Sequence, residues 1–310
     1  MGVLLNILML PLVNAADWLT NYDKRILITI DHDLIDEALT NFPVMIFLNS
    51  SRLNRDYTND DLSDLRFTSN DGTTEYDFEI EYYNSTHIWA WVEIPSISNL
   101  TDTTFYMYFG YEAASSGENK IGTWNSNFMM VQHMRDNTTS SIVDSTVNDN
   151  DGTKKAANEP IEANGEIGKA LDFDGENDYV RVTKDDSLDL GTERSYGFWI
   201  KVVAYPTDES IDEAMRYHWL LASYRGDCVR WEIGIKQSDD TSKVLCPVIA
   251  DIPEGVWKYI VIVANGTCVK LYIDGTQWGS NVSYDGTYRD DWGTDLFIGA
   301  WSATDRFMNC

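Results

Sequence analysis

The stretch "GKALDFDGENDYVRV", residues 168–182, sets the expectation for the fold. Apolar or aromatic side chains at Leu171, Phe173, Tyr179 and Val180 flank a centre of short acidic and amide side chains. Short apolar runs that alternate with polar residues and are bounded by Gly, Asn and Asp are typical of β-strands. The stretch therefore predicts two short strands joined by a tight acidic turn.

The same pattern recurs along the whole chain. Helical periodicity is confined to residues 31–42 and 208–215, each long enough for a turn or two. We therefore expect an all-β protein built from two β-sandwich domains. The predicted strands cover residues 25–30, 42–48, 65–69, 76–83, 87–94, 104–110, 128–134, 169–173, 178–182, 195–203, 217–223, 229–235, 243–249, 257–264, 268–275 and 295–300.

The charge balance excludes one class of partner. The 310 residues carry 23 Lys and Arg against 50 Asp and Glu, a net charge of −27. Such a polyanion repels phosphate backbones, so we expect no nucleic-acid partner. Hydrophobic residues make up 43% of the chain, which is enough for globular cores.

The first residues indicate export. Residues 3–13 form an apolar run that is too short to span a bilayer, and Val13-Asn14-Ala15 has the small residues that precede a signal-peptidase cut. We predict a signal peptide over residues 1–16, cut after Ala15 or close by, although its start has no Lys or Arg. The alternative is a disordered apolar N-terminus. We expect no transmembrane segment and a secreted or cell-surface protein.

Two further features fit an exported protein. The first is a set of N-x-[ST] sequons, which predict glycosylation at Asn49, Asn84, Asn99, Asn137, Asn265 and Asn281. The second is a set of cysteines that fits no zinc motif and predicts disulfides among Cys228, Cys246, Cys268 and Cys310. Four cysteines allow three pairings. Two predicted strands around a polar turn favour Cys228 with Cys246, and Cys268 with Cys310 follows only by elimination.

Two parts of the chain resemble known families. "WLTNYDKRILITI", "NFPVMIFL", "DLRFTSNDGTTEYDFEIEYY", "IWAWVEIPSIS" and "DTTFYMYFGYEAA" follow one another as in the DUF2341 family. "GEIGKALDFDGENDYVRV", "SYGFWIKV", "WKYIVIVANGTCVKLYIDGTQWG" and "DLFIGAW" resemble laminin-G-like domains of the concanavalin A-like jelly rolls. The resemblance implies a DUF2341-like sandwich over residues 17–116. It also implies a jelly roll over residues 117–310 that lacks, or replaces, its last strand.

The acidic turn has two interpretations. In the structural one, Gly175 supplies a positive φ and neighbouring side chains cap the turn. In the functional one, the turn holds Ca²⁺, which prefers carboxylate, amide and carbonyl oxygens, and several jelly rolls of this superfamily bind calcium near this turn. The predicted calcium ligands are Asp172, Asp174, Asn177 and Asp178.

Catalytic patterns are weak. Glu79 and Glu81 share one face of a predicted strand at about the separation of a retaining glycosidase pair, but a solvated strand face is the favoured interpretation. The histidines are scattered, and no nucleophile elbow, Walker loop or dinucleotide motif is present. We therefore expect no enzymatic activity, with a glycoside hydrolase as the least favoured option.

Aromatic side chains are the better candidates for contact with a ligand, because sugar C–H faces stack on aromatic rings. Trp89 and Trp91 lie on the face opposite the predicted core side of their strand, and Tyr106 and Tyr108 share that surface if the two strands pair. Packing is the competing interpretation. In the second domain, the aromatics in or beside polar loops are Trp278, Tyr284, Tyr288, Trp292 and Trp301.

These observations favour a non-catalytic module. We expect a secreted or surface protein that binds a glycan or a cell-surface protein, assisted by Ca²⁺. The alternative is a structural or protein-binding module of a cell-envelope assembly. The warrant for the ligand class is analogy between folds, and a fold does not fix a function.

Overall fold

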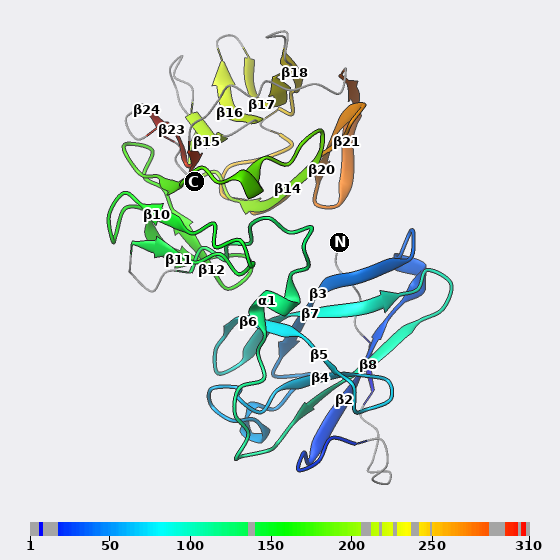
Figure 1. Ribbon diagram of the computed structural model, residues 1–310. Helices are drawn as coiled ribbons and strands as arrows, with labels where there is room; N and C mark the ends of the chain where they lie inside the picture. Colours follow the sequence, from blue (N-terminus) through cyan, green and yellow to red (C-terminus); the bar gives the residue numbers. More distant parts are fainter. Residues whose placement is uncertain are drawn as a thin grey trace. The chain divides into compact units, whose positions relative to one another are not determined.

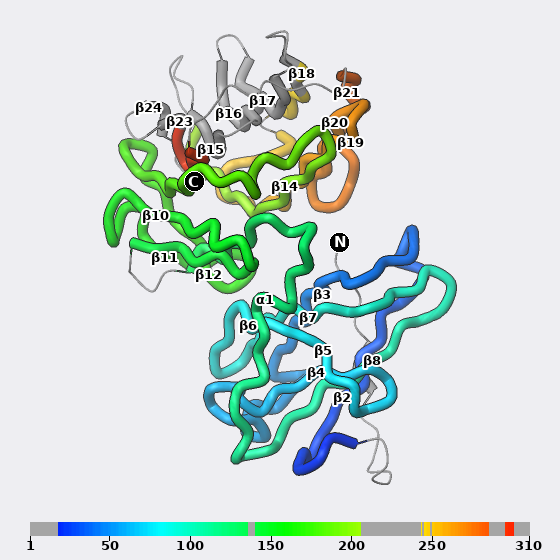
Figure 2. The backbone as a smooth tube through the Cα atoms, viewed as in Figure 1, coloured from blue at the N-terminus to red at the C-terminus, as the bar shows by residue number. Residues whose placement is uncertain are grey.

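The computed structural model describes most of the chain (Figures 1 and 2). Only the backbone is described, and not the side chains, for the strand residues 6–8, 212–216, 219–225, 228–236, 301–302 and 305–307. The described residues are 6–8, 18–135, 140–205, 212–216, 219–225, 228–236, 242–248, 250–284, 295–302 and 305–307.

The chain divides into two compact units. The N-terminal unit comprises residues 1–128 and 145–147, and the C-terminal unit comprises residues 129–144 and 148–310. Both are built almost entirely from antiparallel strands, which confirms the all-β prediction. The single described α-helix is the short α1 (Lys120–Thr123). Among the described residues no helix is long and apolar enough to span a membrane.

Two sheets face one another in the N-terminal unit. One has the order β1-β2-β8-β4-β5 and the other the order β3-β7-β6. The strands are β1 (Asn6–Leu8), β2 (Lys24–Ile30), β3 (Leu39–Asn49), β4 (Arg66–Ser69), β5 (Glu75–Tyr76), β6 (Phe78–Tyr83), β7 (His87–Ile97) and β8 (Thr103–Phe109), with 3-10 turns at His32–Leu34 and Arg55–Tyr57.

Alternation along each strand builds the core between these sheets. In β7 the side chains of Ile88, Ala90, Val92 and Ile94 are buried, while Trp89 and the other residues between them are half-buried on the opposite face. Burial of one large aliphatic side chain contributes about 1.5–3 kcal/mol. The period of two in the sequence therefore decides which face of the sheet packs inward.

Strands β7 and β8 do not pair, so the condition for a shared aromatic surface on these strands is not met. β7 pairs with β3 and β6, whereas β8 pairs with β2 and β4 in the other sheet. Trp89 and Trp91 therefore share no surface with Tyr106 and Tyr108. Tyr108 is fully buried, and its hydroxyl donates to the Gly72 carbonyl at 2.9 Å.

The C-terminal unit contains a larger and a smaller sheet. Their orders are β18-β17-β16-β15-β22-β13-β10-β9 and β14-β19-β20-β21. Their strands are β9 (Ser141–Ile142), β10 (Gly152–Lys154), β13 (Val180–Val182), β14 (Glu193–Ile200), β15 (Asp212–Arg216), β16 (Trp219–Arg225), β17 (Cys228–Lys236), β18 (Ser242–Leu245), β19 (Lys258–Asn265), β20 (Cys268–Ile273), β21 (Thr276–Ser283) and β22 (Leu296–Ile298). Two hairpins, β11 (Ile161–Asn164) with β12 (Lys169–Asp172) and β23 (Ala300–Ser302) with β24 (Asp305–Phe307), and a 3-10 turn at Asp186–Leu188 complete the unit.

The acidic turn passes the chain from one sheet to another. β12 pairs with β11, whereas β13 pairs with β10 and β22. The two strands of the opening stretch exist, but they do not form a hairpin with each other. Leu171 and Phe173 are buried on one side of the turn and Val180 on the other, so both arms are fixed by the core.

Other predicted elements differ from the structure. Residues 128–134 form no strand and contribute one isolated bridge, Gln132 with Asp144. Residues 212–215, the second half of a segment expected to hold a helical turn, belong to β15, because pairing with β16 and β22 overrides local helix propensity. Residues 6–8, within the expected signal peptide, pair as β1 with β2.

Candidate ligand-binding site

A pocket of about 270 Å³ opens in the C-terminal unit at one end of the four-stranded sheet. Its walls come from the β20–β21 hairpin, the start of β19 and the segment that precedes β19. The lining residues are Asp251, Lys258, Ile273, Asp274, Thr276, Gln277 and Trp278. An indole beside carboxylate, ammonium, amide and hydroxyl groups is the composition of a small polar-ligand site.

The hairpin turn positions the polar end of the pocket. Asp274 and Gly275 connect β20 to β21 with φ values of 51° and 79°. Two successive positive φ values are typical of the two-residue type I′ turn, which favours Asp-Gly. The Asp274 carboxylate then accepts from Tyr259 N at 3.0 Å and pairs with Lys258 Nζ at 2.7 Å. The turn is thereby tied to β19.

The core positions the aromatic wall. Trp278 lies opposite Leu271 in the β20–β21 register and packs, half-buried, against the core cluster of this unit. The facing segment is also anchored: Ile252 is buried, and Asp251 Oδ2 accepts from Val248 N at 2.8 Å. Both walls are therefore set before any ligand arrives.

The charge state of Asp274 suits hydroxyl recognition. Burial acts to raise its pKa, but the hydrogen bonds from Lys258 and Tyr259 outweigh burial and hold the pKa below its usual value. The group is therefore ionised at neutral pH. An ionised carboxylate accepts from a hydroxyl and an adjacent ammonium donates to one, so the pocket can bind a polyhydroxylated molecule.

Of the predicted ligand-binding aromatics in this unit, Trp278 lines the pocket. Tyr284 does not: it is 7% exposed, and its hydroxyl donates to the Thr192 carbonyl at 2.6 Å. It is a core residue, because the polar end of a buried Tyr needs a partner. Tyr288 and Trp292 lie outside the described residues, and Trp301 is described only by its backbone in β23.

The two predicted tryptophans of the N-terminal unit are both half-buried. Trp91 donates to Glu81 Oε2 at 2.7 Å and packs against Trp124, with ring centroids 5.2 Å apart. It is therefore held within the unit. Trp89 contacts Phe47, Tyr82 and His87 instead.

Glu79 and Glu81 do not form a solvated strand face, so that expectation is wrong. Their exposed fractions are 2% and 7%. Trp124 Nε1 donates to Glu79 Oε2 at 2.7 Å, and Ser145 Oγ donates to Glu79 Oε1 at 2.6 Å. Buried carboxylates require such donors. Sequence reasoning missed the donors to Glu79 because Trp124 and Ser145 lie 45 and 66 residues away along the chain.

The predicted calcium ligands do lie around one turn. Asp174 Oδ1 accepts from the backbone N–H groups of Glu176 and Asn177 at 2.8 and 3.2 Å, and Asp178 Oδ2 accepts from Asp174 N at 3.1 Å. Asp172 and Asp174 are both exposed, on the face opposite Leu171 and Phe173. Gly175 has a φ of 76°, as the structural interpretation requires.

A lysine occupies the side of the turn where a cation would bind. Lys155 Nζ donates to Asn177 Oδ1 and pairs with Glu159 Oε2 at 2.8 Å. Asp178 is 4% exposed, burial raises its pKa, and its Oδ1 has no hydrogen-bond partner among the described residues. The described residues around the turn do not complete the cage of six to eight oxygens that Ca²⁺ needs, so a calcium site here stays a prediction.

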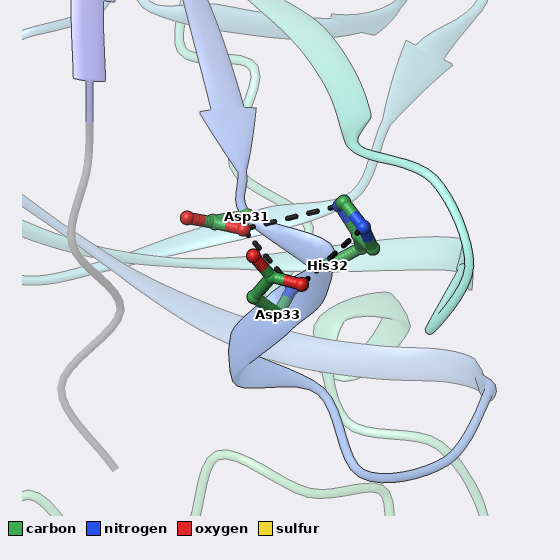
Figure 3. Close-up of side chains that lie close together, drawn as sticks. All are labelled: Asp31, His32 and Asp33. Atoms are coloured by element: carbon green, nitrogen blue, oxygen red, sulfur yellow. Dashed lines mark hydrogen bonds and ion pairs between the residues drawn. The ribbon is translucent and has the colours of Figure 1, made fainter.

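One further cluster has ligand atoms close together. Asp31, His32 and Asp33 place theirs within 4.8 Å of one another (Figure 3). His32 Nδ1 lies 2.7 Å from Asp102 Oδ1, and this hydrogen bond holds the His32 pKa above its usual value. A histidine that favours its protonated form is a poor metal ligand. We assign this cluster no function.

The described cysteines do not support the expected bridges. Ile233 lies opposite Leu245, which places Cys246 beside Glu232, four residues from Cys228. Four residues of strand span roughly 13 Å, far beyond the Cα separation of a disulfide. Cys268 is a free thiol whose Sγ lies 3.4 Å from Asn265 Oδ1, and Cys310 lies outside the described residues.

Five of the sequon asparagines lie among the described residues, and Asn137 lies outside them. Three are strongly exposed: Asn84, Asn265 and Asn281. Asn49 and Asn99 are half-exposed. In Asn49, Asn84 and Asn265 the amide oxygen accepts from the hydroxyl two residues later at 2.6–3.0 Å.

Family models match both halves of the chain. Residues 61–146 match DUF2341, a domain of unknown function, and residues 174–309 match the concanavalin A-like lectin/glucanases superfamily. The region that matches DUF2341 precedes the region that matches the concanavalin A-like superfamily, in the predicted order. This confirms the resemblance seen in the sequence. No curated protein matches the chain.

Several solved structures show a distant likeness. Domain 4 of an extracellular GH43 arabinanase from Geobacillus stearothermophilus, in complex with arabinotriose, is 18% identical with a TM-score of 0.37, over 56% of this chain and 84% of that one. The binding domain of botulinum neurotoxin DC, in complex with SialylT, is 13% identical with a TM-score of 0.40, over 56% of this chain and 44% of that one. Scores this low transfer no ligand to this chain.

Most of the pocket lining was not predicted. Asp251, Lys258, Thr276 and Gln277 come from three segments that only the fold brings together. The one local signal was the dipeptide Asp274-Gly275, which predicts a tight hairpin turn and hence a carboxylate at its tip. That signal indicates a turn and says nothing of a ligand.

Proposed function

We propose that the protein is a non-catalytic carbohydrate-binding module whose concanavalin A-like domain binds a glycan in the Trp278 pocket. The observation that carries the proposal is that one pocket places the half-exposed indole of Trp278, on the β20–β21 hairpin, together with the ion pair between Asp274 of that hairpin and Lys258 of β19. An aromatic ring provides the flat apolar contact for a sugar ring, and the charged pair provides an acceptor and a donor for its hydroxyls.

The family description supports the ligand class. A model of lectins and glucanases covers residues 174–309, which include the whole pocket. The pocket chemistry favours the lectin role over hydrolysis. A general acid needs a raised pKa, whereas the pKa of Asp274 is lowered and its carboxylate already accepts two hydrogen bonds.

The proposal includes export of the protein from the cell. The expected signal peptide and the sequons support a secreted or cell-surface location, where the glycan of another cell or matrix is the natural partner. Calcium forms no part of the proposal, because Lys155 already supplies a positive charge to the acidic turn.

A glycan-array screen of the full chain, run in Ca²⁺ and again in EDTA, tests this function. We expect binding in both arms. The screen is repeated with Trp278→Ala and with the matched control Trp199→Ala, which removes an indole that is 38% exposed on β14 of the same unit and does not line the pocket. Binding that survives Trp199→Ala and disappears in Trp278→Ala supports the site. No binding by folded wild-type protein rejects the proposed function.

A further inference from the structure

Four rings form a continuous aromatic row in the N-terminal unit. Phe47 on β3, Trp89 on β7 and Tyr82 on β6 follow one another across the sheet, with centroid separations of 5.2 Å and 5.8 Å. His87 stacks on both Phe47 and Trp89, at 5.6 and 5.4 Å and with interplanar angles of 13° and 25°. Strands β3 and β7 run side by side in Figure 1.

The aromatic row lies on the outer face of its sheet. Ile46, Leu48, Ile88 and Ala90, the sequence neighbours of Phe47 and Trp89, belong to the core. Because side chains alternate between the faces of a strand, the row points away from that core. Each of its four members is half-buried. Such a flat, partly exposed aromatic surface is suited to contact with a further group.

The asparagines of two sequons lie next to this row. Asn49 follows Phe47 by two residues, and Asn84 follows Tyr82 by two residues. Asn49 ends β3 and shares the face of Phe47, because residues two apart on a strand share a face. Asn84 comes directly after β6, and its N–H donates to the carbonyl of His87, a member of the row, at 2.9 Å. Asn49 is also the register partner of His87. The row is thus bordered by an asparagine at the end of each outer strand.

The other sequons lack this arrangement. The residues two positions before Asn99, Asn137, Asn265 and Asn281 are Ile97, Arg135, Val263 and Gly279. Of the six sequons, only the two at the aromatic row have a ring at that position. At these two sequons, the two-residue spacing in the sequence and the position at the end of the sheet both place the asparagine beside an aromatic ring of the row.

The loops after both asparagines hold the oxygen atoms of their side-chain amides. Asn84 Oδ1 accepts from Thr86 N, Thr86 Oγ1 and His87 N at 2.9, 3.0 and 2.8 Å, and Asn49 Oδ1 accepts from Ser51 N and Ser51 Oγ at 3.1 and 2.6 Å. All of these hydrogen bonds are made by the amide oxygen, and none of them uses Nδ2. Nδ2 is the atom to which an N-linked sugar is attached.

We propose that the aromatic row binds the chain's own N-linked glycans. The first sugars of the glycans at Asn84 and Asn49 pack on the rings of Tyr82, Trp89 and Phe47. In the attachment step, a lipid-linked pyrophosphate donor transfers its oligosaccharide. The anomeric carbon forms a bond to Nδ2, its bond to the diphosphate oxygen breaks, and Nδ2 loses one proton. The apolar faces of the sugars then cover the rings.

A cycle of four proteins tests this inference on the full chain. Wild type and Tyr82→Leu are each secreted from N-glycosylating eukaryotic cells and also produced without glycans in bacteria, and peptide mass spectrometry reports the occupancy of Asn84 and Asn49. We expect glycosylation to raise the melting temperature of the wild type by about 3 °C and that of Tyr82→Leu by less than about 1 °C. Any structural role of Tyr82 cancels in the difference.

Trp199→Ala is the matched control, because it removes a ring from the other unit and leaves the aromatic row intact. Its gain on glycosylation should equal that of the wild type. Equal gains in wild type and Tyr82→Leu overturn the inference. Unmodified amides at both Asn84 and Asn49 overturn it as well. Neither result bears on the Trp278 pocket, which has its own test.

Discussion

Trp278 lies directly opposite Leu271 in the β20–β21 register, so one part of the indole packs on the core while another part lines the pocket. This double role connects folding to recognition. The residue that closes the core also presents the aromatic surface, and the neighbouring turn at Asp274 adds the charged groups. The entropy cost of ordering the site on ligand binding is therefore small.

Replacement of Trp278 should separate recognition from stability. We expect Trp278→Phe to keep the core contact and to weaken glycan affinity severalfold, whereas Trp278→Ala weakens it by about tenfold or more, because a stacked ring contributes on the order of 1 kcal/mol beyond its buried area. Titration calorimetry with the best glycan from the array measures both changes, and circular dichroism checks the fold. Equal affinity in all three proteins contradicts the role of Trp278.

The pKa of Asp274 predicts how binding depends on pH. The folded-state pKa is lowered, so the contribution of the ionised group to stability is present above the unfolded pKa and is lost as pH falls through the folded pKa. The expected window lies below about pH 4, the usual pKa of Asp. We expect wild-type affinity to be flat from neutral pH down to that window and to fall within it.

Asp274→Asn removes the titrating group and serves as the comparison. Its affinity at neutral pH should be lower, since Lys258 loses its charged partner, and the fall below about pH 4 should be absent. Affinity measured by calorimetry between pH 3 and 7 for both proteins decides the matter. The same acid-side fall in Asp274→Asn would assign the effect to another group.

Much of the fold followed from local pattern, whereas the site did not. The period of two in β7 predicted its buried face, and the family segments predicted the order of the two domains. Local pattern failed where contacts between distant parts of the chain determine the structure. Residues 212–216 form strand β15 by pairing with β16, and Tyr284 is buried with its hydroxyl bonded to the Thr192 carbonyl. Asp251, Lys258 and Trp278 belong to no recognisable motif and come from three different segments, so the pocket could not be predicted before folding.

The favoured pairing of Cys228 with Cys246 is not supported by the strand register, for a related reason. Strands β17 and β18 are paired as expected, but their register could not be predicted, because the polar connection over residues 237–241 carries no turn signal that sets it. A shift of four residues separates Cys228 from the position opposite Cys246. We therefore expect Cys268 to react with a thiol reagent in the native full chain without prior reduction, and a chain that is unreactive at Cys268 until reduced contradicts its free thiol.

The acidic turn offers the last prediction, on metal dependence. Because the Lys155 ammonium contacts Asn177 and pairs with Glu159, we expect EDTA to leave the melting temperature of the wild type unchanged within about 1 °C.

Lys155→Met removes that charge and leaves Asp174 and Asp178 repelling each other. The variant should melt about 2 °C lower at low salt and recover part of the loss at high salt, where the repulsion is screened. Lys169→Met is the matched control, because Lys169 lies outside this turn and pairs with Glu162 instead. A wild-type chain that loses several degrees in EDTA and regains them in Ca²⁺ would show that the turn takes calcium despite its lysine.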